Sequence, residues 1–203
     1  MNNFMLMVAG TGNNLCHYFA GKYPNRIGMI YSPSYWNNPK VKYYMPYALD
    51  NGCFTEWNEE LYFWMLNDSK SYHNPLWVCV PDVVGDFKKT MKYWYLYKDR
   101  VQKYKYKLAF VCQDGCSPKD VPKEAFCCFI GGTTSWKLNN AHRFKGIREK
   151  LHIGRVNTIK RLSWAISIGA DSVDGSGWVR AKGKQYYDFI DFFESTNKQS
   201  TLF

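Results

Sequence analysis

The feature of this sequence that most limits its possible folds is a repeated alternation of short apolar runs with longer amphipathic segments. The apolar runs, such as KLAFVC and AFCCFI, are hydrophobic at nearly every position. Strands of this kind are typical of parallel sheets that helices cover on both faces. About seven or eight such units in one chain of this length predict a compact TIM-type (β/α) barrel, with a doubly wound open sheet as the alternative. No linker or repeat interrupts the pattern, so we expect residues 1–203 to form a single α/β domain.

Capping residues predict where several helices begin. Thr55 is the expected N-cap of the helix in TEWNEELYFWML, and Asp86 that of the helix that follows it in the sequence. Asn157 is expected to cap a helix with one apolar face, which Gly169 ends. A further helix is predicted over residues 139–150.

The net charge of the chain favours a polyanionic partner. Lysine and arginine number 27 against 17 aspartates and glutamates, which gives a formal charge of +10. Aromatic residues make up 18% of the chain, and their rings can stack on unpaired bases. An AT-rich gene would also enrich lysine, asparagine and tyrosine, so the charge alone does not identify nucleic acid as the partner.

Hydropathy and cysteine usage predict a cytoplasmic protein. No apolar run is long enough to span a membrane, and the first residues lack the basic region of a signal peptide. Seven scattered cysteines are typical of a reduced protein. The spacing of Cys112, Cys116, Cys127 and Cys128 is not that of paired CxxC knuckles, so we expect buried thiols and no metal.

Polar residues and glycines follow several of the predicted strands. They are Asp50, Asp82, Gln113, the pair Gly131 and Gly132, and Asp174. A single aspartate after a strand is most often a turn or capping residue. In a barrel, however, the carboxyl ends of all strands open on one face, where active sites lie. We therefore expect this set to converge on one pocket.

Five segments that contain these residues resemble a known family. They are ALDNGCF, PDVVGD, VCQDG, FIGGTTSWK and HIGRVNTIKRLSWAISIGADSVDG, and they lie between about Tyr47 and Gly177. In sequence and order they are similar to segments of the tRNA-guanine transglycosylase superfamily, most closely its DNA-acting branch, the deazapurine-in-DNA modification protein A family. That family's C-terminal zinc subdomain has no counterpart here, since no cysteine follows Cys128. The resemblance therefore favours DNA over tRNA and implies no cofactor.

The resemblance implies a role for each site residue. Asp174 matches the nucleophilic aspartate, and Asp50 matches the aspartate that moves protons on the base. Asp82, Gln113 and the amides near Gly131 and Gly132 match the groups that hold the base edge. The implied reaction exchanges guanine in DNA for a free 7-deazaguanine, on a base that is flipped out or single-stranded.

Elementary chemistry is consistent with these roles. Cleavage of an N-glycosidic bond develops positive charge on the sugar, which a carboxylate can stabilise or capture. The departing base needs a proton or a hydrogen bond from a general acid. Two aspartates in one pocket could supply both functions.

Further residues flank the site segments and are weaker candidates for nucleic-acid contacts. They are Arg155, Lys137, Trp136, Trp178, Arg180 and His152. The cations could touch phosphates and the tryptophans could stack on bases. Core packing is an equally good interpretation for the tryptophans. For His152, which begins the predicted strand HIGR, a structural role is equally good.

Other functions remain open from the sequence. Water could replace the incoming base, which would make the protein a DNA glycosylase, with a role in phage defence as one setting. A non-catalytic nucleic-acid-binding barrel would tolerate loss of the aspartates, and a nucleoside hydrolase would act with little dependence on salt. The oligomeric state is not predicted.

Overall fold

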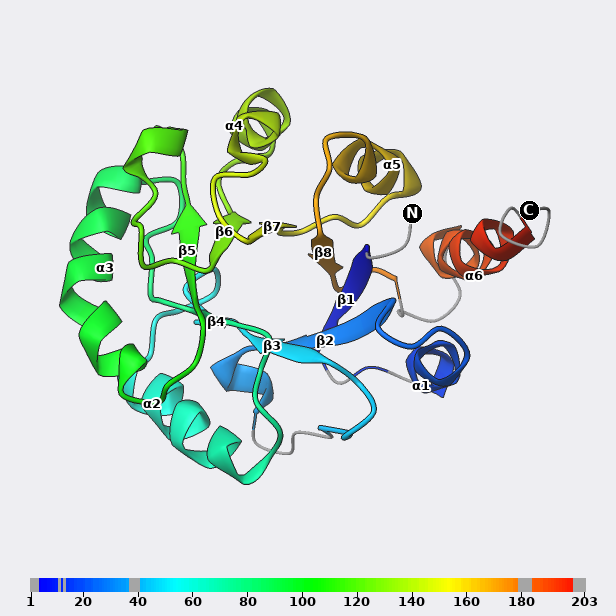
Figure 1. Cartoon of the computed structure of the whole chain (residues 1–203), viewed down its shortest axis with the longest axis horizontal. Helices are drawn as coiled ribbons and strands as arrows, with labels where there is room; N and C mark the ends of the chain where they lie inside the picture. The colour runs from blue at the N-terminus through cyan, green and yellow to red at the C-terminus, as the bar shows by residue number, and fades with distance from the viewer. Residues whose placement is uncertain (1–3, 11, 13, 37–40, 179–183, 199–203) are drawn as a thin grey trace.

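Eight parallel strands, each hydrogen-bonded to the next one in chain order, form a closed barrel (Figure 1). The computed structural model describes residues 4–10, 12, 14–36, 41–178 and 184–198. The strands are β1 (Met5–Ala9), β2 (Ile27–Tyr31), β3 (Tyr47–Leu49), β4 (Val78–Cys79), β5 (Leu108–Cys112), β6 (Cys127–Ile130), β7 (Lys150–Ile153) and β8 (Ser172–Gly175). The TIM-type barrel predicted from the sequence is confirmed, and the open-sheet alternative is excluded because β8 pairs with β1.

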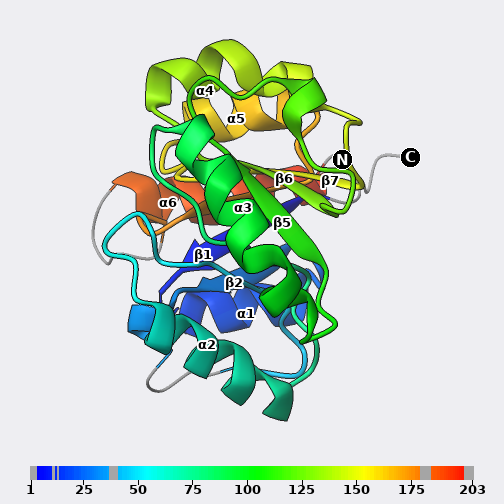
Figure 2. The same ribbon diagram turned by 90° about the vertical axis from the view of Figure 1, so that its left-hand side faces the viewer.

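Helices surround the barrel on the outside (Figures 1 and 2). They are α1 (Asn14–Lys22), α2 (Glu59–Asp68), α3 (Phe87–Gln102), α4 (Thr134–Asn140), α5 (Ile159–Ser167) and α6 (Lys184–Lys198). Where the structure describes them, the connections from β2 to β3 and from β5 to β6 contain short 3₁₀ turns, at Pro33–Tyr35 and Pro118–Asp120, in place of an α-helix. None of the helices in the described ranges is long and apolar enough to cross a membrane.

Strand residues alternate between two hydrophobic cores. Met7 points into the barrel, whereas its neighbours Leu6 and Val8 pack between the barrel and the helices. The interior core also contains Ile30, Ala48, Trp77, Cys79, Ala109, Val111, Cys127 and Phe129. Because side chains of a strand alternate between its two faces, a strand buried on both sides must be apolar throughout, as the sequence showed.

Helix boundaries agree with the sequence where a side-chain cap forms as expected. The side chain of Asp86 accepts a hydrogen bond of 2.9 Å from the Lys89 N–H and caps α3. The buried residues of α3 are Thr90, Trp94, Tyr97 and Val101, at helical spacing. Gly169, with φ of 77°, follows the last turn of α5, as predicted.

Two predicted caps were wrong by one to three residues. Asn58, not Thr55, caps α2, because the chain first turns at Gly52, where φ is 79°. Thr158, not Asn157, caps α5, and the side chain of Asn157 instead accepts from the Gly177 N–H at 2.8 Å.

Two further predicted segments also differ from the structure. The helix predicted over 139–150 was wrong, because Thr133 caps α4 earlier and a 3₁₀ turn over Ala141–Phe144 follows it. The strand predicted over 152–156 ends at Ile153, and Arg155 has a left-handed backbone with φ of 60°.

The absence of a side chain at Gly28 is required by the packing of the barrel interior. A Cβ there would lie 2.8 Å from the Pro46 carbonyl oxygen and 2.9 Å from the Met5 sulfur. We predict that Gly28→Ala lowers the free energy of unfolding by about 1–3 kcal/mol, the usual cost of overpacking. Urea denaturation followed by circular dichroism measures it.

Gly21→Ala is the matched control for this substitution. Gly21 lies in α1, and an added Cβ there meets no atom within 4 Å. Alanine should stabilise the helix by up to about 1 kcal/mol. Equal stability of the two variants would contradict the packing argument.

Candidate active site

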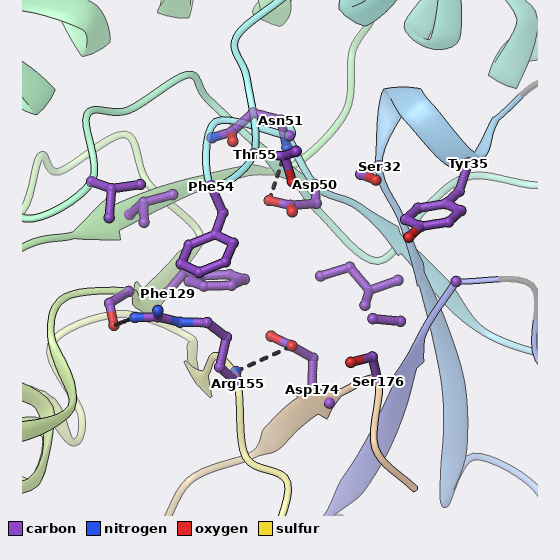
Figure 3. A pocket seen from close by; sticks show the side chains of 18 of the residues that line it. Ser32, Tyr35, Asp50, Asn51, Phe54, Thr55, Phe129, Arg155, Asp174 and Ser176 are labelled. Atoms are coloured by element: carbon purple, nitrogen blue, oxygen red, sulfur yellow. Dashed lines mark hydrogen bonds between the residues drawn. The ribbon is translucent and has the colours of Figure 1, made fainter. Parts of the chain in front are cut away.

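A cavity of about 740 Å³ opens at the carboxyl ends of the strands (Figure 3). This volume is within the usual range for small-molecule sites. Five positions predicted from the sequence line it, namely Asp50, Asp82, Gln113, Gly131 and Asp174. The barrel brings them together from five different strand ends, which answers why polar residues follow apolar strands in this chain.

Asp50 follows β3 directly and lines the cavity. Its own N–H donates to the Tyr31 carbonyl at 2.7 Å, which holds the residue at the end of β3. The Asn51 N–H donates to its Oδ1 at 2.9 Å. Burial raises the pKa of Asp50 from 3.8 to about 7, and the negative charges of Asp174 and then Asp82 add to this effect.

Asp82 is held by two amide side chains. The Asn51 Nδ2 donates to its Oδ1 at 2.7 Å, and the Gln113 Nε2 donates to its Oδ2 at 2.5 Å. Burial raises the pKa of Asp82 to about 6, whereas these two hydrogen bonds and the charge of Arg155 act in the opposite direction. Side-chain amides occupy both oxygens of Asp82, so it is less available to a ligand than Asp50.

Gln113 uses its side chain to join three loops. Its Oε1 accepts from the Gly85 N–H and the Gly132 N–H, both at 2.9 Å. The Gly131 N–H donates to the Cys112 carbonyl at 3.0 Å. A Cβ at Gly131 would lie 2.5 Å from the Gln113 Nε2, so glycine is needed there. The amides of Gly131 and Gly132, predicted to hold a ligand, are thus already used within the protein.

Asp174 is held in place by the end of β7. Its Oδ2 lies 3.1 Å from the His152 Nε2, and its Oδ1 accepts from the Arg155 N–H at 3.1 Å. The left-handed backbone of Arg155 points that N–H at Asp174, and such a conformation in a non-glycine residue is strained. Only 7% of Asp174 is exposed, and this part faces the cavity.

The Arg155 side chain forms one wall of the cavity (Figure 3). Its Nη2 donates to the carbonyls of Gly131 and Gly132. Its guanidinium lies over the Phe54 ring, 4.6 Å from the centroid. Among the described residues that line the cavity, Arg155 is the one with a positive charge.

Of the other residues considered for nucleic-acid contacts, those that the structure describes are not among the residues that line the cavity. Trp178 is fully buried and donates from Nε1 to the Val156 carbonyl at 2.6 Å, which leaves no ring face for a base. Trp136 is half-buried against Phe144. Arg180 lies outside the described residues.

Lys137 and His152 are buried as well. Lys137 donates to the Gly154 carbonyl, and burial, followed by the nearby charge of Arg155, lowers its pKa to about 7. His152 lies inside the barrel with no exposed surface. Neither residue can reach a phosphate on the protein surface.

Sequence reasoning missed several residues of the cavity wall. Asn51, Phe54 and Asn157 line it, together with Ser32 and Tyr35. Asn51 adjoins Asp50 in the segment LDNG, which is a cluster of polar and turn residues after a strand and could have been included. The sequence predicts Asn157 only as a helix cap. Its hydrogen bond with Gly177 connects two loops that are distant in sequence, so no local pattern reveals it.

Comparison with known proteins gives structural matches only. No family model matches the sequence, and no curated protein does. A solved structure described as native KDPGal has a TM-score of 0.57 and 10% identity, over 98% of this chain and 96% of that one. Phospho-2-dehydro-3-deoxyheptonate aldolase (DAHP synthase) from Thermotoga maritima has a TM-score of 0.54 and 9% identity, over 98% of this chain and 70% of that one. At such low identity these matches show a shared fold.

The predicted membership of the tRNA-guanine transglycosylase superfamily was wrong, and with it the DNA transglycosylase and DNA glycosylase functions. Solved structures that match include KDPGal and DAHP synthase, and no family model supports the resemblance. The physical reason is visible in the fold. Each of the five segments that carried the resemblance lies at the end of a barrel strand or in the turn after it, where glycines and polar residues gather in many barrels.

The raised pKa of Asp50 predicts a dependence of stability on pH. Because the folded-state pKa exceeds the ordinary value of 3.8, the stabilising contribution is present below that value and is lost as the pH rises through about 7. Asp50→Asn cannot ionise and escapes this loss. We expect it to be more stable than the wild type by about 2–4 kcal/mol near pH 8, and about equal near pH 4.

Urea denaturation at the two pH values measures this difference, and ¹³C NMR of the carboxyl carbons gives the titration directly. Asp99→Asn is the control, since the Asp99 side chain is 77% exposed on α3. A wild type that is as stable as Asp50→Asn at the higher pH would show that Asp50 titrates normally.

Proposed function

We propose that this chain is an enzyme that makes or breaks a carbon–carbon bond next to a carbonyl group, with Asp50 as the general acid–base. The observation that carries the proposal is the position of Asp50 in the cavity, where burial and two neighbouring carboxylates raise its pKa to about 7. A group with such a pKa is present in both protonation states near neutral pH, which is the condition for efficient proton transfer in both directions.

The fold comparison supports the type of reaction. DAHP synthase carries the name of an aldolase, and it shares with this chain a barrel that matches 98% of the residues here. Active sites of such barrels lie at the carboxyl ends of the strands, where the cavity of this chain is found. Fold likeness alone does not transfer a reaction, so the proposal depends on the chemistry of the cavity.

An aldol cleavage needs the groups that the cavity contains. A base removes the proton of a hydroxyl group, the adjacent carbon–carbon bond breaks, and its electron pair passes to the carbon next to the carbonyl. The resulting enolate then takes up a proton from the same group. Asp50 can perform the first step when ionised and the last step when protonated.

The walls of the cavity indicate the kind of substrate. Asp174 presents a carboxylate that can accept from substrate hydroxyl groups, and Arg155 offers a guanidinium for one carboxylate or phosphate. Three aspartates against one arginine disfavour a highly anionic ligand. We therefore infer a small hydroxylated carbonyl compound with no more than one strongly anionic group.

Carboxyl groups, rather than an amine, carry the chemistry in this proposal. Lysine amines can form Schiff bases with carbonyl substrates, but no lysine is present among the described residues that line the cavity. The buried Lys137 donates to the Gly154 carbonyl instead. This arrangement leaves Asp50 as the group best suited to move protons.

Proton exchange at carbon tests the proposal. We would incubate the protein in D₂O with a panel of 2-oxo acids and hydroxylated aldehydes, singly and in pairs, and follow C–H to C–D exchange and new products by ¹H NMR. Asp50→Asn should lower the rate by about 10²–10⁴-fold, the usual contribution of a general acid–base group.

Asp99→Asn, on the surface of α3, should leave the rate unchanged. The rate of the wild type should change between about pH 6 and pH 8, where Asp50 titrates. No exchange with any substrate of the panel, or full activity of Asp50→Asn, would contradict the proposal.

A further inference from the structure

A second cavity, of about 620 Å³, lies at the opposite end of the barrel. Its lining includes Met5, Trp77 and Ser172, with Lys107, Lys150 and Asp171 toward the solvent. These residues lie at the amino ends of the strands or just before them. The barrel therefore has an open pocket at each end, and the hydrophobic interior separates them.

Three polar side chains cross that interior from one pocket to the other. Asp174 lines the cavity at the carboxyl ends of the strands (the upper cavity). Ser172 lines the cavity at the amino ends (the lower cavity). His152 lies between them, with Nδ1 at 2.8 Å from the Ser172 hydroxyl and Nε2 at 3.1 Å from the Asp174 Oδ2. The connection follows from strand geometry, because Ser172 and Asp174 are two residues apart on one face of β8, and His152 pairs with Ser172.

The surroundings of His152 leave it no other polar partner in the described interior. Its ring has no exposed surface and lies between the rings of Trp77 and Phe129, at centroid distances of 4.9 Å and 4.6 Å. The interior cluster around it is otherwise hydrophobic. A buried imidazole is costly unless both nitrogens are hydrogen-bonded, and here both are.

We propose that Ser172 and His152 form a proton relay that connects Asp174 with the solvent of the lower cavity. An ionised Asp174 can only accept, so the Nε2 of His152 carries the proton and its Nδ1 accepts the Ser172 hydroxyl proton. When Asp174 takes the Nε2 proton, the Nδ1 takes the proton of Ser172. Ser172 takes one from hydronium or a protonated buffer in the lower cavity.

The transfers are balanced and reversible. One proton enters at Ser172 and one is delivered to Asp174, while His152 changes from one neutral tautomer to the other. When Asp174 recovers a proton from the ligand, the same transfers run backwards and restore the starting tautomer. The relay extends the proposed function: Asp50 moves the hydroxyl and carbon protons, whereas Asp174 lends a proton to the carbonyl oxygen of the ligand and recovers it. A bound ligand would separate Asp174 from bulk water in the upper cavity, so this proton must come from the other end of the barrel.

Solvent exchange of the His152 ring proton tests the relay without any substrate. With ¹⁵N-labelled histidine, NMR should show the proton on Nε2, and His152→Gln identifies the signal among the four histidines. The Nε2 proton leaves toward Asp174, and His152 stays neutral only if Nδ1 gains a proton from Ser172 at the same time. Asp174→Asn, which keeps an acceptor for Nε2–H but cannot take the proton, and Ser172→Ala, which removes the proton source for Nδ1, should each slow the exchange by about tenfold or more.

The matched variants separate relay from structure. Ser172→Thr, with Asp174 intact, retains a hydroxyl and should exchange at the rate of the wild type. Ser167→Ala removes an exposed hydroxyl on α5 and should leave it unchanged. Circular dichroism and thermal unfolding confirm that each variant is folded. Equal exchange rates with and without the Ser172 hydroxyl, or a proton on Nδ1, would overturn the relay.

A kinetic readout links the relay to catalysis. With a substrate from the panel described above, Ser172→Ala should lower kcat by about tenfold with KM unchanged, and Ser172→Thr should restore kcat. A fall in kcat that Ser172→Thr does not restore, or a change in KM alone, would mean a structural role. If the panel shows no turnover, the proposed function fails while the exchange experiment still decides the relay.

Discussion

The pairing of β8 with β1 is the contact on which the rest of the structure depends. It places Asp174 beside Met7 and closes a sheet that would otherwise have two exposed edges. Closure turns eight strand ends into a ring, and residues as distant in sequence as Asp50 and Asp174 then face one cavity. Without it, Asp174 would lie at an edge and the electrostatic effect that raises the pKa of Asp50 would be lost.

The fold, and the cavity at the carboxyl ends of its strands, could be predicted from the sequence because both follow from local patterns. Strands that are apolar on both faces require a covered parallel sheet, and polar residues after them mark the carboxyl ends. The roles of individual residues could not be predicted in this way. The Gly132 N–H donates a hydrogen bond to the Gln113 side chain, and the Trp178 ring donates one to the Val156 carbonyl. No local sequence pattern reveals these contacts. For the same reason, short segments at strand ends suggested a family that the comparisons do not support.

The cavity of this protein differs in charge from the chain as a whole. The chain carries a formal charge of +10, yet the cavity contains three aspartates and one arginine. In that cavity and behind its wall, burial moves pKa values toward neutrality from both directions. Asp50 rises to about 7, and Lys137, behind the wall, falls to about 7. The net charge therefore influences which charged partners the surface attracts, whereas desolvation sets the pKa values of the groups in and near the cavity.

Arg155 connects Asp174 with the loop at Gly131 and Gly132, using its backbone for one contact and its side chain for the other. Its backbone N–H holds Asp174, and its guanidinium holds the carbonyls of Gly131 and Gly132, while its φ of 60° is one that glycine would adopt without strain. Selection for stability and selection for activity would thus act in opposite directions at this position. Glycine at this position would relieve the backbone strain but would lose the hydrogen bonds from the guanidinium to Gly131 and Gly132. The identity of residue 155 in related barrels would therefore record whether the cavity is still under selection for use.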